Sequence, residues 1–114
     1  MITLDYLLAP EVKLPTILAT LKQTLEKTIE ILSSWGFSSD YALMGRSAGS
    51  YLAALLIKEG FTPKHLIRFY GYYTLDVPAF RQPNPHYLVF PRVAPMEVEA
   101  LIEQKPIVSG EMFK

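Results

Sequence analysis

The clearest hydrophobic pattern in the chain recurs every three or four residues between positions 14 and 32. In a helix these apolar residues would form one stripe, and charged residues such as Lys22 and Glu26, one turn apart, would cover the opposite face. Pro15 suits a first helical turn and Gly36 suits a helix end. The pattern therefore predicts an amphipathic helix whose stripe consists of Leu14, Ile17, Leu18, Leu21, Leu25, Ile29 and Leu32.

Three other apolar runs predict β-strands. In residues 2–8, Ile, Leu, Tyr and Leu occupy alternate positions, which is typical of a short and mostly buried strand. Residues 41–44 are continuously apolar, which predicts a strand covered on both faces. Residues 64–71 predict a third strand, and residues 48–59 between the last two strands have a helical pattern.

The order strand, helix, strand, helix, strand indicates parallel βαβ units in an α/β fold, with a mostly parallel sheet of about three strands flanked by helices. We assign residues 1–76 to this core. Residues 77–114 hold six of the nine prolines, so we expect a proline-rich loop with one short helix at 95–104.

Composition excludes several classes of protein. Lys plus Arg and Asp plus Glu both number 11, so the chain has no basic field for nucleic acid. Without cysteine it can form neither disulfides nor thiolate metal sites, and a cytoplasmic location is expected. No apolar run approaches the roughly 20 residues that a membrane span needs. Nothing in the sequence calls for a metal or an organic cofactor.

Residues 45–49 read Gly-Arg-Ser-Ala-Gly, a G-x-S-x-G pattern at a predicted strand-to-helix junction. Such a tight turn holds the central serine in a strained conformation with its hydroxyl above the sheet. We expect both Gly45 and Gly49 to be needed, because larger side chains would collide across the turn. The helix that follows directs free N–H groups toward a developing oxyanion. The alternative is a merely structural Gly-Ser-Gly turn.

With these residues the sequence resembles the α/β-hydrolase fold, in particular the esterase and lipase branch related to hormone-sensitive lipase. The resemblance covers about residues 1–76. It implies that Ser47 is the nucleophile, that the Ala48 N–H is an oxyanion-hole donor, and that Gly45 and Gly49 form the elbow. Ser50 stands where that branch usually has glycine. The branch's Asp-Tyr-x-Leu-Ala-Pro-Glu stretch is matched here by Asp5, Tyr6, Leu8, Ala9, Pro10 and Glu11, of which Asp5 and Glu11 look structural.

The resemblance leaves the acid and the base unassigned. In this fold the acid and then the histidine follow the serine in the chain, usually far beyond the length available here. Asp76 and His86 come in the right order, but a turn aspartate and a solvated loop histidine are the competing interpretation. His65 precedes the third predicted strand and is expected on the surface. We therefore expect a central fragment of a serine hydrolase that acts on a small ester or acyl substrate, inactive or nearly so alone.

The predicted sheet is small and has open edges, so self-association through these edges is also expected. Two other functions remain open at this point. The chain could be a non-catalytic structural or interaction domain with a hydrolase-like core. It could also be a phosphate-binding βαβ module that uses the Ser47 turn, although it lacks the lysine of a P-loop. The start of a lid or cap at residues 77–114 competes with a plain connecting loop.

Overall fold

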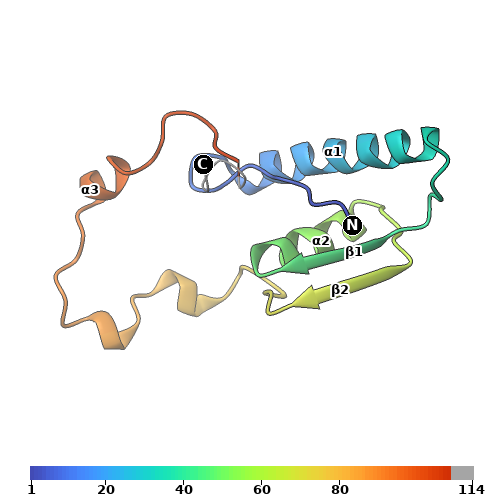
Figure 1. The fold of residues 1–114 in the computed structure, drawn as a ribbon. Coiled ribbons are helices and arrows are strands. Elements are labelled where there is room, and N and C mark those ends of the chain that lie inside the picture. The colour runs from blue at the N-terminus through green and yellow to red at the C-terminus, as the bar shows by residue number, and fades with distance from the viewer. Residues whose placement is uncertain (109–114) are drawn as a thin grey trace.

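A computed structural model describes residues 1–108 of the chain (Figure 1). Two helices and a two-stranded sheet form the body, and an extended segment leaves the body and returns to it. The body contains α1 (Leu14–Ser34), β1 (Ala42–Arg46), α2 (Ala48–Lys58) and β2 (His65–Phe69). The extended segment contains the short 3-10 helices η1 (Pro78–Arg81) and η2 (Pro85–Tyr87) and the helix α3 (Pro95–Glu99).

The predicted amphipathic helix is confirmed as α1. Proline lies in its first turn, and Gly36 just beyond its end has a φ of 84°, which suits glycine because it has no Cβ. Ile17, Leu21 and Leu25 from the predicted stripe are buried. The apolar face of α1 therefore lies against the rest of the body.

The sheet consists of β1 and β2, which pair in parallel from Ala42 opposite His65 to Arg46 opposite Phe69. The helix α2 connects the two strands and packs on one face of the sheet, so the mixed α/β class is confirmed. The predicted strand-helix-strand order over residues 41–71 is also confirmed, although β1 extends beyond the predicted residues 41–44 to Arg46 and β2 is shorter than the predicted residues 64–71.

The prediction of a third strand at residues 2–8 is wrong. Among pairings within residues 1–108, this segment has one β-bridge, from Leu7 antiparallel to Val108, and the Leu8 N–H donates to the Ile107 carbonyl at 3.0 Å. Leu4, Tyr6 and Leu7 pack against the helical core instead of joining the sheet. An alternating pattern identifies a face that can be buried, but it supplies no neighbouring strand.

The core lies between the two helices and the N-terminal loop. It comprises Val12, three residues of α1 and two of α2, and Leu43 and Phe61 pack against it. The prediction that β1 is covered on both faces is wrong, because no described element covers the face away from α2. The exposed residues on that face are Ala42, Met44, Arg46, His65, Ile67 and Phe69.

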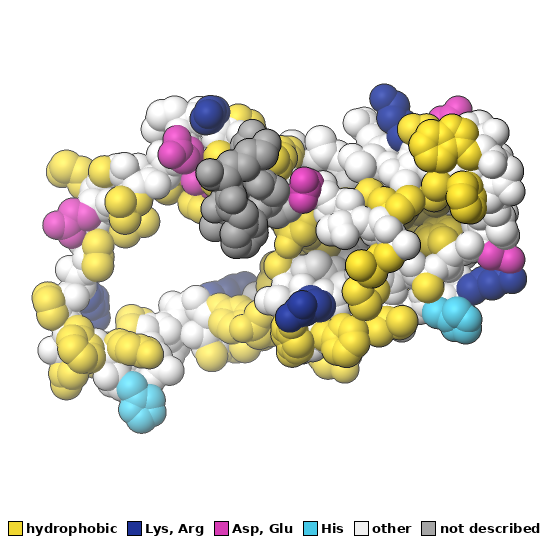
Figure 2. All heavy atoms as spheres, in the orientation of Figure 1, with side chains coloured by type: hydrophobic (Ala, Val, Ile, Leu, Met, Phe, Trp, Pro, Cys, Tyr) yellow, Lys and Arg dark blue, Asp and Glu magenta, His cyan; other side chains and the backbone are white. Residues whose placement is uncertain are grey.

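We call residues 74–102 the arm. Every residue from 78 to 101 is exposed, and the arm carries apolar side chains along its whole length (Figure 2). An opening remains between the arm and the body when all heavy atoms are drawn. The predicted short helix is confirmed as α3, which begins at Pro95. Residues 109–114 of the predicted proline-rich segment lie outside the described residues. No helix within residues 1–108 has the length and apolar character needed to cross a membrane.

Candidate active site

A single residue, Ser47, connects the end of β1 to the start of α2. Its backbone has a φ of 49° and a ψ of −121°. A positive φ is uncommon for any residue other than glycine and is strained by about 1–3 kcal/mol. The strand-to-helix junction is therefore as tight as the G-x-S-x-G pattern predicts. Such strain is typical of functional turns.

The hydroxyl of Ser47 is not used to cap the helix that follows it. A serine at this position commonly accepts a hydrogen bond from an N–H of the first helical turn. Ser47 makes no such bond and is exposed. The side chain that the motif singles out is therefore accessible, and its position has no explanation in helix capping.

Backbone hydrogen bonds fix the turn on both sides. The Ser47 N–H donates to the Phe69 carbonyl at 3.0 Å, which ties the turn to β2. The Ser47 carbonyl accepts from the Ser50 N–H at 3.0 Å, which ties it to α2. Ala48 is the first helical residue, so its N–H has no acceptor within the helix. This N–H lies at the positive end of the helix dipole, beside Ser47.

The two glycines of the motif do not have equal roles. A Cβ on Gly45 would lie 2.3 Å from the Gly49 carbonyl oxygen and 2.7 Å from the Ser50 Cα, so only glycine fits between β1 and α2. A Cβ on Gly49 would meet no atom within 4 Å. The expectation that both positions must be small is thus correct for Gly45 and wrong for Gly49. It is the backbone of Gly49 that lies close to Gly45, while the space that a side chain on Gly49 would occupy is open.

A cluster that the sequence analysis missed holds the loop after β2 against the first turn of α2. Ser50 is completely buried, and its Oγ accepts from the Arg68 Nε at 3.0 Å. The Arg68 Nη2 donates to the Tyr72 carbonyl at 2.8 Å. A Cβ on Gly71 would lie 2.3 Å from the Ser50 Oγ, so the loop passes directly over this serine. The alternation along β2 could have indicated that Arg68 faces α2.

A second strained residue lies beside Ser47. Tyr70 has a φ of 38° and directly follows Phe69 at the end of β2. Ser47 directly follows Arg46 at the end of β1, and Arg46 and Phe69 are paired in the sheet. The Arg46 Nε donates to the Tyr70 hydroxyl, and the guanidinium lies 5.5 Å from the centre of the tyrosine ring. Both strands therefore end in strained residues at the same edge of the sheet.

Within residues 1–108, neither candidate for acid or base is hydrogen-bonded to Ser47. Asp76 forms an ion pair with Arg81. The backbone N–H of His86 donates to the Asn84 side chain at 3.0 Å, at the start of η2 on the exposed arm. His65 is the first residue of β2, at the end of the strand away from Ser47. None of the hydrogen bonds or ion pairs found in residues 1–108 joins Ser47 to an acid or a histidine.

Glu11, which the resemblance marks as structural, connects the two ends of the described chain. Its Oε1 accepts from the Glu103 N–H at 3.2 Å, while its Oε2 is buried and has no hydrogen-bond partner among residues 1–108. The Ala9–Pro10 peptide bond just before it is cis. Glu11 therefore helps to hold the returning arm against the N-terminal loop. Within residues 1–108, no group of three acidic or histidine side chains could hold a metal ion.

Comparisons of the chain with models of protein families, with curated proteins and with solved structures gave no match.

Proposed function

We propose that this chain carries the nucleophile elbow of a serine hydrolase that cleaves carboxylic esters or, less readily, amides. Ser47 is the nucleophile and the Ala48 N–H is one donor of the oxyanion hole. The observation that supports this function is the conformation of Ser47 between a parallel strand and a helix. This serine is strained and exposed, and its hydroxyl does not cap the helix. A structural turn would be more stable with glycine at this position.

The chemistry follows from this placement. The Ser47 Oγ attacks the carbonyl carbon of the ester while its proton passes to a base, and the carbonyl oxygen becomes an oxyanion that the Ala48 N–H can stabilise. Collapse of this intermediate expels the alcohol, which takes the proton, and leaves an acyl group on Ser47. Water then releases the acid by the same steps in reverse.

A serine hydroxyl is a weak nucleophile without an adjacent base. Since Ser47 bonds to neither histidine nor carboxylate in the described residues, we expect the 114-residue chain to be inactive or nearly so. A partner or a further segment would have to bring the base to the exposed side of Ser47. Asp76 and His86 remain the candidates within the chain, and they would act only if the arm moved.

The test is covalent labelling with a fluorophosphonate, followed by peptide mass spectrometry. We expect slow modification at Ser47 in preference to the chain's other serines, loss of that modification in Ser47→Ala, and acceleration by added imidazole as an external base. Variants Asp76→Asn and His86→Ala should label at the unchanged rate. Labelling spread evenly over the serines would contradict the elbow. Fast labelling without imidazole would contradict the missing base.

A non-catalytic interaction domain is the second candidate function. It is favoured because no base is bonded to Ser47 within the described residues and because one face of the sheet is uncovered. This function predicts that Ser47→Ala leaves every binding property unchanged and that imidazole rescues no labelling. The two functions therefore differ in the result of one experiment.

A further inference from the structure

The two strands that end beside Ser47 each bring one arginine to that edge of the sheet. Arg46 is the last residue of β1 and directly precedes Ser47, and Arg68 is the last residue but one of β2. They are the only charged residues in the sequence over positions 46–57 and 66–75. No ion pair found within residues 1–108 includes either arginine. Two positive charges therefore lie near the positive end of the α2 dipole without a paired acid among the described residues.

The two guanidinium groups have different surroundings. Arg68 directs its donors into the protein, from Nε to the Ser50 Oγ at 3.0 Å and from Nη2 to the Tyr72 carbonyl at 2.8 Å. Its guanidinium also lies 4.9 Å from the centre of the Tyr73 ring, so Arg68 holds the loop after β2. Arg46 is exposed, and its terminal Nη1 and Nη2 groups have no hydrogen-bond partner within residues 1–108. Arg46 is therefore able to donate to a bound molecule.

Tyr70 fixes the direction of the Arg46 side chain. The Arg46 Nε donates to the Tyr70 hydroxyl, and the guanidinium lies 5.5 Å from the centre of the tyrosine ring. Tyr70 holds this position with a strained, positive φ of 38°. A side chain that is already held in one orientation loses less entropy when it binds a ligand. Because Nε is occupied, the free side of the guanidinium is its pair of terminal amines, which matches the two oxygens of a carboxylate.

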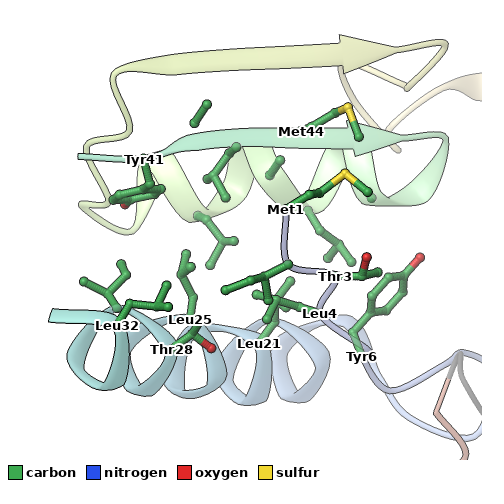
Figure 3. A pocket seen from close by; sticks show the side chains of 18 residues that line it. Met1, Thr3, Leu4, Tyr6, Leu21, Leu25, Thr28, Leu32, Tyr41 and Met44 are labelled. Carbon is green, nitrogen blue, oxygen red and sulfur yellow. The ribbon is translucent and has the colours of Figure 1, made fainter. Parts of the chain in front are cut away.

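The cavity that reaches the elbow offers no charged side chain. It has a volume of about 600 Å³ and lies between α1, α2, β1 and the N-terminal residues (Figure 3). Gly49 of the elbow lines it, as does Met44 toward the carboxyl end of β1. None of the residues that line it is charged, so a carboxylate in this cavity would lose its hydration without gaining an opposite charge. An anionic group on a substrate at Ser47 would therefore bind to Arg46 and not in the cavity.

We propose that Arg46 is a specificity-determining residue of this hydrolase and selects esters that carry a separate carboxylate group, such as the half-esters of dicarboxylic acids. This inference rests on the proposed function, because it assigns a substrate class to the same serine. The two terminal amines of Arg46 bind the two carboxylate oxygens while the Ser47 Oγ attacks the ester carbonyl. One guanidinium balances the single charge of a carboxylate, whereas a doubly charged phosphate group would keep one charge unpaired. Tyr70 acts as the positioning residue for Arg46.

The first test compares a fluorophosphonate whose alkyl chain ends in a carboxylate with the uncharged methyl ester of the same probe. The ratio of their labelling rates at Ser47, measured with added imidazole, reports the preference for charge. We expect the anionic probe to label the parent chain about tenfold faster or more, the size expected for charge-assisted hydrogen bonds. The ratio should approach one in Arg46→Gln and be partly kept in Arg46→Lys, which retains the charge but not the planar fork.

Two further variants separate position from overall charge. Tyr70→Phe removes the hydroxyl that holds Arg46 and keeps both charges of the edge, so the ratio should fall by a few-fold. Arg92→Gln is the matched control, because it removes the same charge from the exposed arm and should leave the ratio unchanged. If Arg46→Gln does not fold, competition on the parent chain replaces it. Monomethyl succinate should then slow labelling by the neutral probe, while dimethyl succinate and, at equal ionic strength, inorganic phosphate should not.

The failure of this inference can be told apart from the failure of the proposed function. Equal ratios in the parent chain and Arg46→Gln, with Ser47 still labelled, would overturn the role of Arg46 and leave the elbow supported. An equal loss of the ratio in Arg92→Gln would show that only the overall charge matters. Phosphate that competed as well as monomethyl succinate would overturn the assignment of a carboxylate. If neither probe labelled Ser47 even with imidazole, the hydrolase function would be contradicted, and the substrate class that depends on it would be wrong too.

Discussion

The two glycines beside Ser47 should respond in opposite directions to the same substitution. In Gly45→Ala the new Cβ would lie 2.3 Å from the Gly49 carbonyl oxygen and 2.5 Å from the carbon of that carbonyl. Both atoms belong to the backbone of α2, so no side-chain rotation can relieve the contact. The first turn of α2 would have to move away from β1.

The size of the effect follows from this contact. Ordinary contact between such atoms is about 3.5 Å, so the substitution demands a shift of roughly 1 Å where the sheet and α2 meet. Overpacking of this kind costs about 1–3 kcal/mol, and we expect the upper end because the opposing atoms are fixed. In a domain whose total stability is about 5–15 kcal/mol, this should lower Tm by about 10 °C or more.

Gly49→Ala is the matched control. Its Cβ would meet nothing within 4 Å, and alanine favours a helix over glycine by up to about 1 kcal/mol, so this variant should be as stable as the parent or more so. Urea unfolding followed by circular dichroism measures both. If Gly45→Ala and Gly49→Ala unfolded at the same urea concentration, the close approach of β1 and α2 at Ser47 would be refuted.

Three further predictions concern the residues at the carboxyl ends of β1 and β2 and Tyr41, which directly precedes β1. Gly71→Ala should destabilise by about 1–3 kcal/mol through its contact with Ser50, and Ser50→Gly should restore part of that loss in a double-mutant cycle. Ser47→Gly should raise the stability by about 1 kcal/mol and abolish fluorophosphonate labelling, because it relieves the positive φ and removes the hydroxyl. Burial raises the pKa of the Tyr41 hydroxyl above 10.0, so the folded chain holds this proton more tightly than the unfolded chain. The contribution of Tyr41 to the free energy of unfolding should therefore be fully present below about pH 10 and be lost as the pH rises through the raised pKa. In urea titrations, Tyr41→Phe should reduce this loss of stability at high pH.

Sequence patterns predicted the elements that are determined by residues close together in the chain. The helix α1 follows from its three-and-four spacing, with proline in its first turn and Gly36 beyond its end. The junction at Ser47 follows from an apolar strand, a glycine that the helix backbone approaches, and a helical pattern directly afterwards. In each case the determining contacts lie within a few residues of one another in the chain.

Long-range contacts could not be predicted in the same way. The alternating residues 2–8 specify a strand only if another strand pairs with them, and the sequence does not say where that strand comes from. The exposed face of β1 has the same origin, since continuous apolar character predicts two covered faces without naming what covers them. The bond between Arg68 and Ser50 joins positions far apart in the chain, so only the three-dimensional arrangement shows it.

The location of the strain is the strongest reason to place function at the carboxyl edge of the sheet. Glycine would relax a positive φ at either Ser47 or Tyr70, yet the chain has a serine and a tyrosine at these positions. These residues follow paired positions on neighbouring strands, and a partly buried hydrogen bond between Arg68 and Ser50 fixes the loop beside them. A fold optimised for stability alone would use glycine at one or both positions. These two side chains are present at an energetic cost, and the exposed Ser47 hydroxyl is the group that such a cost would serve.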